Sequence, residues 1–428
     1  MPLDYRIAER TLANGLRVIV SEDHSVPNVT VNLWVNVGSR HETQGRTGFA
    51  HLFEHLMFQG SRHVANGEHF SALMAEGGRL NATTWFDRTN YFETVPKGAL
   101  ELALWMEADR HGHLLDAVTQ ESLDNQRDVV KEEKRQRYDN VPYGNALIDM
   151  YAAIFPEGHP YHHPTIGSME DLDAASLGDV HAFYRRFYGP NNTVLTLVGD
   201  LTPEVGFAAA ERYFGPLLAS AEPARVVVDP LPPLSEPVRD VHVEDVPADR
   251  LHLAFRLPVD DTPEFFAASL AMDVLGGLAT SRLYRRLVRR EQIANSVQAH
   301  AMGFVDGVSL GFIGIDVAEG ASAEEVEAHT CEELKRFAAE GPTAVEMESA
   351  LAQTERSWLS SLASQEERAD HICHRATLQG DPGWVNTFLD RLAQVTPAQV
   401  REVAEQWLVP EARAVVAYLR SEHEGVPA

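Results

Sequence analysis

Residues 48–60 read Gly-Phe-Ala-His-Leu-Phe-Glu-His-Leu-Met-Phe-Gln-Gly and contain the pattern His-x-x-Glu-His. On an α-helix, positions i, i+3 and i+4 lie on one face, so His51, Glu54 and His55 are predicted to point the same way. Two imidazoles one turn apart are a suitable pair of zinc ligands, and a carboxylate beside them can act as a general base. A chain with 19 His residues can contain this spacing by chance, so the stretch needs support from elsewhere in the sequence.

The composition sets limits on the architecture and on the partners. A chain of 428 residues with 44% hydrophobic residues is expected to form two or more domains. The formal charge of −27 argues against nucleic acid or an anionic membrane as a partner, and it would attract basic peptides. An acidic surface also simply keeps a protein in solution, and the charge alone does not decide between these two interpretations.

The beginning of the chain and its cysteines bear on the compartment. The first residues show no basic region followed by an apolar one, and no run approaches the roughly 18 apolar residues of a membrane helix. Cys331 and Cys373 lie far apart in the sequence, which is not the pattern of a disulfide framework. We therefore expect a cytoplasmic protein.

Two parts of the chain are predicted to have the same build. A helix, a proline break and a strand follow one another at residues 180–198 and again at 400–418, which indicates a duplication with a period of about 220 residues. The proline-rich stretch 226–237 lies between the copies and is predicted to be a linker. We therefore expect an α+β protein with domains at 1–225 and 238–428.

The first of these halves holds further polar residues of interest. Strands are predicted at 79–85 and 89–95, after the pair Gly77-Gly78 that ends a helix. A long charged helix is predicted at 119–138, and it contains Glu132 and Glu133. Charged helices are usually solvated, and for most residues of this one we keep that interpretation.

These stretches together resemble the pitrilysin/insulinase metallopeptidases, the group that includes the mitochondrial processing peptidases. The resemblance runs through residues 46–61 with the His-x-x-Glu-His, or inverzincin, pattern, through 77–84, and through 126–133. Residues 161–201 and the duplicated halves also fit, so nearly the whole chain is covered. The family fold implies two homologous halves, each an antiparallel-rich sheet with helices, which enclose a clam-shell chamber on dimerisation.

The resemblance also implies a ligand set and a reaction. It implies one Zn²⁺ per chain, held by His51, His55 and a Glu on a later helix, with Glu54 as the general base of peptide hydrolysis. Spacing from the second His permits either Glu132 or Glu133 as the third ligand. The family's Glu-x₆-Glu unit, laid on residues 126–133, favours Glu133, and it places Gln126 beside the ligands where active members often carry Glu.

Substrate binding and assembly are implied in the same way. The segment Asn81-Ala82 resembles the sheet edge to which a peptide substrate adds as a strand. Family members also use an Arg and a Tyr seven residues apart in the second half, but Val288 and Asn295 stand at these positions. We therefore expect a heterodimer whose other subunit supplies the Arg/Tyr pair, or otherwise a homodimer.

The function expected from the sequence is that of a zinc endopeptidase acting on unfolded peptides. Two alternatives remain at this point: a non-catalytic core or structural subunit of the same fold, and a peptide-binding chamber with vestigial hydrolysis. Zinc content distinguishes the first alternative from a peptidase, and turnover of an unstructured peptide distinguishes the second.

Overall fold

The computed structural model describes residues 3–421, which divide into two compact units. The first unit contains the residues up to Lys134 together with His163–Val226 and Ser357–Phe388. The second unit contains Arg135–His162, Val227–Arg356 and the residues from Leu389 onward. Each unit thus includes one segment from the far side of the predicted linker. The domain boundaries 1–225 and 238–428 describe the sequence repeat and stay a prediction.

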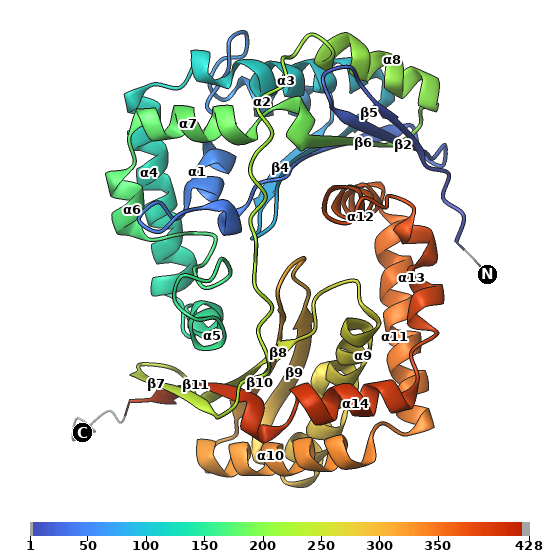
Figure 1. The fold of residues 1–428 in the computed structure, drawn as a ribbon. Helices are drawn as coiled ribbons and strands as arrows, with labels where there is room; N and C mark the ends of the chain where they lie inside the picture. Colours follow the sequence, from blue (N-terminus) through green and yellow to red (C-terminus); the bar gives the residue numbers. More distant parts are fainter. Residues whose placement is uncertain (1–2, 422–428) are drawn as a thin grey trace. The chain divides into compact units, whose positions relative to one another are not determined.

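The first unit is built on a six-stranded sheet (Figure 1). Its strand order is β1 (Ala8–Thr11), β2 (Arg17–Glu22), β6 (Thr193–Gly199), β3 (Asn28–Val35), β5 (Thr89–Pro96) and β4 (Arg79–Thr84). The pair β2 and β6 is parallel, and the other neighbours are antiparallel. Strand β4 therefore lies at an edge, with β5 as its neighbour in the sheet.

The two faces of this sheet are covered by different helices. Leu33 belongs to the apolar cluster that joins one face to α3 (Leu100–His113) and α8 (Pro203–Phe214). Its neighbour Trp34 belongs to the cluster on the opposite face, which includes residues of α12 (Gln365–Leu378). Successive side chains of a strand point to opposite faces, so the apolar run of β3 serves both layers.

The remaining helices of the first unit lie near the residues singled out in the sequence. They are α1 (Phe49–Leu56), α2 (Glu68–Ala75), α4 (Gln120–Lys134), α6 (Met169–Ala174) and α7 (Leu177–Phe187). The predicted charged helix is thus present, and its α-helical part ends at Lys134 before a π-helical turn at Arg135–Asp139.

The second unit contains a five-stranded sheet. Its strand order is β7 (Val238–Glu244), β11 (Arg413–Arg420), β8 (Arg250–Leu257), β10 (Ser309–Val317) and β9 (Ala294–Met302). Its helices include α5 (Ala146–Ile154), α9 (Pro263–Met272), α10 (Ala323–Glu340) and α14 (Pro397–Trp407). Two further helices, α11 (Ala344–Ala363) and α13 (Trp384–Leu392), have residues in both units.

The sheets repeat one topology. The order β2-β6-β3-β5-β4 in the first unit corresponds to β7-β11-β8-β10-β9 in the second, including the parallel first pair. The helix, proline break and strand predicted twice are α7, Pro190 and β6, and then α14, Pro410 and β11. The predicted α+β class with duplicated halves is therefore confirmed, and the chamber formed on dimerisation stays a prediction.

Candidate metal centre

Helix α1 carries the His-x-x-Glu-His pattern, and its N-terminus is held from within the first unit. The Glu42 carboxylate accepts hydrogen bonds from the backbone N–H groups of Gly48 and Ala50, each at 2.8 Å. This satisfies two of the amide groups that an α-helix leaves unpaired at its start and places negative charge at the positive end of its dipole. Gly48 itself has a φ of 87°, a conformation that favours glycine.

The two faces of α1 differ as the pattern predicts. Leu52, Phe53 and Leu56 are fully buried, so they fix one face of the helix against the unit. The side chains of His51 and His55 are 12% and 22% exposed and lie on the other face. Burial of the apolar face therefore fixes the direction in which the polar face points.

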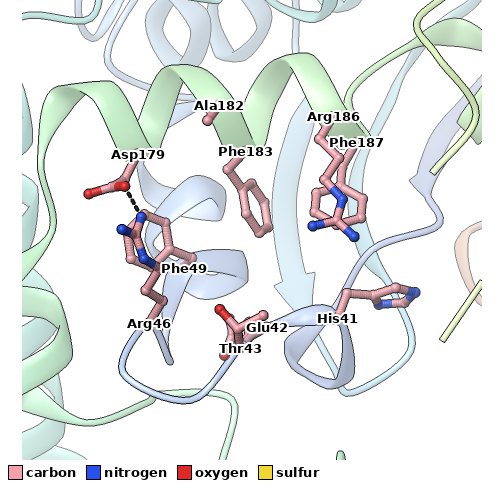
Figure 2. Close-up of a pocket in the computed structure, with 10 residues that line it drawn as sticks. All are labelled: His41, Glu42, Thr43, Arg46, Phe49, Asp179, Ala182, Phe183, Arg186 and Phe187. Carbon is pink, nitrogen blue, oxygen red and sulfur yellow. Dashed lines mark ion pairs between the residues drawn. The ribbon is translucent and has the colours of Figure 1, made fainter. Parts of the chain in front are cut away.

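A small pocket of about 140 Å³ adjoins the start of α1 and is a separate feature (Figure 2). Phe183 of α7 points into it from above, and Arg46 forms an ion pair with Asp179 across one side. None of the residues of the His-x-x-Glu-His pattern lines this pocket. We regard these contacts as the attachment of α1 to α7 rather than as a reaction site.

Helix α4 brings a carboxylate to the two imidazoles. Glu133 Oε2 lies 3.6 Å from His51 Nε2 and 3.2 Å from His55 Nε2. Ligating atoms of these three residues all lie within 4.8 Å of one another. Spacing left Glu132 and Glu133 open, and in the structure it is Glu133 that joins the two histidines.

The three residues fit a zinc ion by chemistry and by separation. Nitrogen and carboxylate oxygen atoms bind Zn²⁺ at about 2.0–2.2 Å, so two ligands of a tetrahedral site lie about 3.4 Å apart. The separations of 3.6 and 3.2 Å between Glu133 and the two imidazoles bracket this value. Three protein ligands of this kind leave a fourth position for water or substrate, as catalytic zinc sites require.

Glu54 lies beside this group and is held by the edge strand. Thr84 Oγ1, at the end of β4, donates a hydrogen bond to Glu54 Oε2 at 2.6 Å. Burial raises the pKa of the Glu54 carboxyl and so does the nearby Glu133, whereas the hydrogen bond from Thr84 and the charges of His55 and Arg88 lower it. A carboxylate with a raised pKa beside a metal site is suited to accept a proton from water.

The other residues predicted for the site lie on the edge strand β4 and on helix α4. Asn81 and Ala82 lie on the edge strand β4, where Asn81 Oδ1 accepts the backbone N–H of Ala82 at 2.9 Å. Gln126 is buried in α4, two turns before Glu133. Within residues 3–421 no hydrogen bond joins its side chain to His51, His55 or Glu133, so its predicted role beside the ligands stays a prediction.

Sequence reasoning gave no role to Thr84, although it ends the stretch Gly77–Thr84 that carries the resemblance. The available signal was strand alternation, because Thr84 lies two residues after the buried Ala82 and must share its face. Arg88 in the following turn was also missed. It donates to the backbone oxygen of Thr83 at 2.9 Å and lies 5.1 Å from the Trp34 ring.

A second group of metal-ligating side chains occurs in the second unit, at Asp149, Asp240 and His242. His242 Nε2 lies 3.0 Å from Asp240 and 3.4 Å from Asp149, and the Tyr418 hydroxyl donates to Asp149. These contacts join the three side chains and Tyr418 in one cluster of ion pairs and hydrogen bonds.

Comparison with known proteins gives the family. Residues 17–168 match the family described as Insulinase (Peptidase family M16), and residues 174–354 match the Peptidase M16 inactive domain. The chain is 31% identical to the zinc protease PqqE of Helicobacter pylori over 303 residues, which are 69% of this chain and 67% of that protein. It is 26% identical to the probable mitochondrial-processing peptidase subunit beta of Schizosaccharomyces pombe, over 95% of this chain and 90% of that one.

The fold has solved counterparts. The crystal structure of a protease from Helicobacter pylori superimposes with a TM-score of 0.90 at 24% identity, over 97% of this chain and 99% of that one. Among the described residues, no helix combines the length and apolar character needed to cross a membrane. From the matches over both halves and the 31% identical zinc protease, the chain belongs to the insulinase family of peptidases, family M16.

Proposed function

We propose that this chain is a zinc-dependent endopeptidase that hydrolyses unfolded peptides. The observation that carries the proposal is the convergence of His51, His55 and Glu133 from two helices, with Glu54 held beside them by an edge strand. In this proposal the three residues hold one Zn²⁺, and Glu54 is not a ligand. Relatives named zinc proteases support the same assignment.

In the proposed hydrolysis, Glu54 and Thr84 have different roles beside the bound zinc ion. A bound zinc ion supplies a Lewis acid that makes a water molecule more acidic and polarises the scissile carbonyl. Glu54 takes the proton of the attacking water and passes it to the leaving amine. Thr84 orients Glu54 through its hydrogen bond, which leaves Oε1 of the carboxylate for the water.

The edge strand β4 supplies the place for the substrate backbone. An edge strand has backbone N–H and C=O groups that can pair with an extended peptide. Because Thr84 of β4 contacts Glu54, a peptide paired along β4 runs past the candidate metal centre. Asn81 and Ala82 are the β4 residues we assign to this pairing.

The assembly we propose is a heterodimer in the cytoplasm. Val288 and Asn295 occupy the positions of the family's Arg/Tyr pair, and Asn295 Nδ2 is engaged in a hydrogen bond to the Val317 backbone oxygen at 3.2 Å. The match of 174–354 to a domain described as inactive agrees with a second half that has no chemistry of its own. The alternative assembly is a homodimer in which other residues replace the pair.

Zinc content and peptide cleavage by the purified chain test the proposal together. We expect about one zinc per chain, cleavage of a long unstructured basic peptide, and loss of cleavage with retained zinc in Glu54→Gln. Zinc bound without cleavage, with activity restored by a second subunit, would support the heterodimer. A chain that binds no zinc at micromolar concentration would instead be a non-catalytic subunit.

A further inference from the structure

A cavity of about 200 Å³ lies between the six-stranded sheet and α12, on the face of the sheet opposite α1 and α3. All of its lining residues belong to the first unit. Drug-sized ligands occupy pockets of about 300–1,000 Å³. This cavity is therefore of a size for one side chain rather than for a cofactor.

The edge strand β4 forms part of the wall of this cavity. Thr83 of β4 and Phe92 of β5 line it, whereas Thr84 points to the other face and bonds to Glu54. A peptide strand paired with β4 alternates its side chains in the same way. One residue of such a peptide therefore points toward Glu54, and the residues next to it point toward α12 and this cavity.

The charge of the cavity is negative. Glu366, Glu367 and Asp370 of α12 line it together with one guanidinium, that of Arg88. Three carboxylates and one guanidinium leave an excess of two negative charges, part of which Arg79 offsets by pairing with Glu366 at 3.1 Å. A cationic side chain is therefore the complementary occupant.

Acceptor atoms remain available for such a side chain. Asp370 Oδ1 accepts three hydrogen bonds, from Asn32 at 3.4 Å, Trp34 at 3.0 Å and Asn90 at 3.1 Å. Within the described residues no hydrogen bond reaches its Oδ2, and the Glu367 carboxylate takes part in no ion pair. The donors on Oδ1 fix the orientation of Asp370 in the absence of any ligand.

The cavity also suits the apolar stem of a long basic side chain. Phe92 provides a wall against which the methylene groups of Lys or Arg can pack while the charged end reaches the carboxylates. Among the described residues, the ligating atoms of these carboxylates do not come together as a metal-binding group, so a bare metal ion is a poorer occupant than a basic side chain.

We propose that this cavity is a specificity subsite that selects a lysine or arginine of the peptide substrate, on the residue next to one whose side chain faces Glu54. The proposal rests on the proposed function, because it uses a peptide paired along β4. It goes further by assigning Glu367 of α12 to substrate selection, with Asp370 adding to the negative charge behind it, at a place separate from the zinc ligands.

Peptide binding to the full chain carrying Glu54→Gln tests the subsite without turnover. The probes are two fluorescent unstructured peptides that differ only in one central residue, lysine or glutamine. We expect the lysine peptide to bind on the order of tenfold more tightly, the size expected for a charged hydrogen bond. Adding Glu367→Gln, at an exposed position, should reduce this preference to about twofold or less.

Glu402→Gln is the matched control, because it removes the same charge from an exposed position of α14. The proposal is overturned if both peptides bind equally, if neither binds, or if Glu402→Gln and Glu367→Gln reduce the preference equally. A chain that binds the lysine peptide selectively but, in its wild-type form with zinc, does not cut it would count against the peptidase function and not against the subsite.

The wild-type chain provides a second readout. If the lysine enters the cavity, the scissile bond should follow the lysine at a constant offset when the lysine is moved along the peptide, as mapped by mass spectrometry. In Glu367→Gln the cleavage positions should become independent of the lysine. Cleavage positions that ignore the lysine in the wild-type chain would contradict the proposal.

Discussion

Helices α1 and α9 occupy equivalent places in the two repeated sheets and differ in what they expose. Each follows the strand that is third in the repeated order, β3 and β8 respectively. Helix α1 is buried on one face and presents His51, Glu54 and His55 on the other. Helix α9 is buried almost throughout and carries only Phe, Ala, Leu, Met and Ser after its first turn.

The repeated fold and the candidate chemistry are therefore separable. Strand order and apolar alternation are kept in both units, so they are what the architecture requires. Three polar side chains on one helix, with a carboxylate from α4, distinguish the first unit. The fold by itself therefore does not assign a function to the second unit.

The largest predicted effect comes from removing the carboxylate that α4 contributes to the candidate metal centre. Glu133→Gln should lower zinc affinity by more than the roughly 10–100-fold that loss of an outer-shell partner causes, and should abolish cleavage. The matched change Glu132→Gln, one residue away, should leave both within about twofold. Metal analysis and competition with a chelator measure the zinc affinities. Equal losses of affinity in the two variants would contradict the assignment of Glu133 as the third ligand.

Buried ion pairs of the two units give the next largest effect. Glu107 is fully buried and pairs with Arg110, which also lies 4.7 Å from the Phe58 ring. Burial alone raises the pKa of the Glu107 carboxyl, but Arg110 and His69 bring it down to about 2. Arg110→Met should cost about 3–5 kcal/mol of unfolding free energy, because it removes the guanidinium that pairs with the buried Glu107 carboxylate and leaves only His69, at 3.4 Å, beside it.

The second unit offers the comparison. Arg282 donates two hydrogen bonds to Glu346, at 2.9 and 2.7 Å, but the Glu346 side chain is 15% exposed and also accepts the Thr343 N–H. Arg282→Met should therefore cost less than Arg110→Met in calorimetry. Adding Glu107→Gln to Arg110→Met should recover part of the loss. A larger cost at Arg282 would contradict this ranking by burial.

Each unit also contains a buried histidine whose protonation opposes folding. Burial lowers the pKa of His111 in the first unit to about 4, and burial together with Arg250 lowers that of His252 in the second to about 4. Below pH 6.5 the unfolded chain binds a proton that the folded chain does not, so stability falls as the pH decreases toward 4. A shift of this size corresponds to about 3 kcal/mol per histidine.

The test compares slopes rather than absolute stabilities. His252→Gln should make the unfolding free energy depend less steeply on pH between about 6.5 and 4. Above pH 7 the slope of the unfolding free energy with pH should stay the same. His111→Gln should reduce the pH dependence of the stability of the first unit in the same way. Hydrogen exchange of the backbone amides in the strands of that unit measures this stability. An unchanged slope in both variants would mean that folding does not lower the pKa of either imidazole.

The sequence predicted much of the fold because alternation and breaks are local signals. The two strands after Gly77-Gly78, the helix carrying His51 and the repeated helix–proline–strand segments are all present. What could not be predicted is that α12, far along the chain, covers the first sheet. Its apolar face shows that it is buried but not which sheet buries it.

The candidate site was predictable to different depths. His51, Glu54 and His55 follow from helical spacing alone, which acts over one turn. The prediction of Glu133 required the family pattern, because no physical rule brings together two residues that are 78 positions apart on different helices. Neither helical spacing nor the family pattern predicts the roles of Thr84 and Asp370. Their contacts depend on strand register and on the packing of a distant helix.

The smallest effect is expected where the two units are most alike, at their exposed ion pairs. Arg212 and Glu101 lie 3.1 Å apart with side chains 65% and 61% exposed, and the Tyr213 hydroxyl donates to the same carboxylate at 2.8 Å. Water solvates both charges, so Arg212→Gln should leave the unfolding free energy nearly unchanged. Arg290→Gln, which removes the pair with Glu291 in the second unit, should do the same. Denaturant titrations of the two variants beside Arg110→Met measure the contrast, and a cost at Arg212 close to that at Arg110 would mean that burial is not what gives an ion pair of this chain its strength.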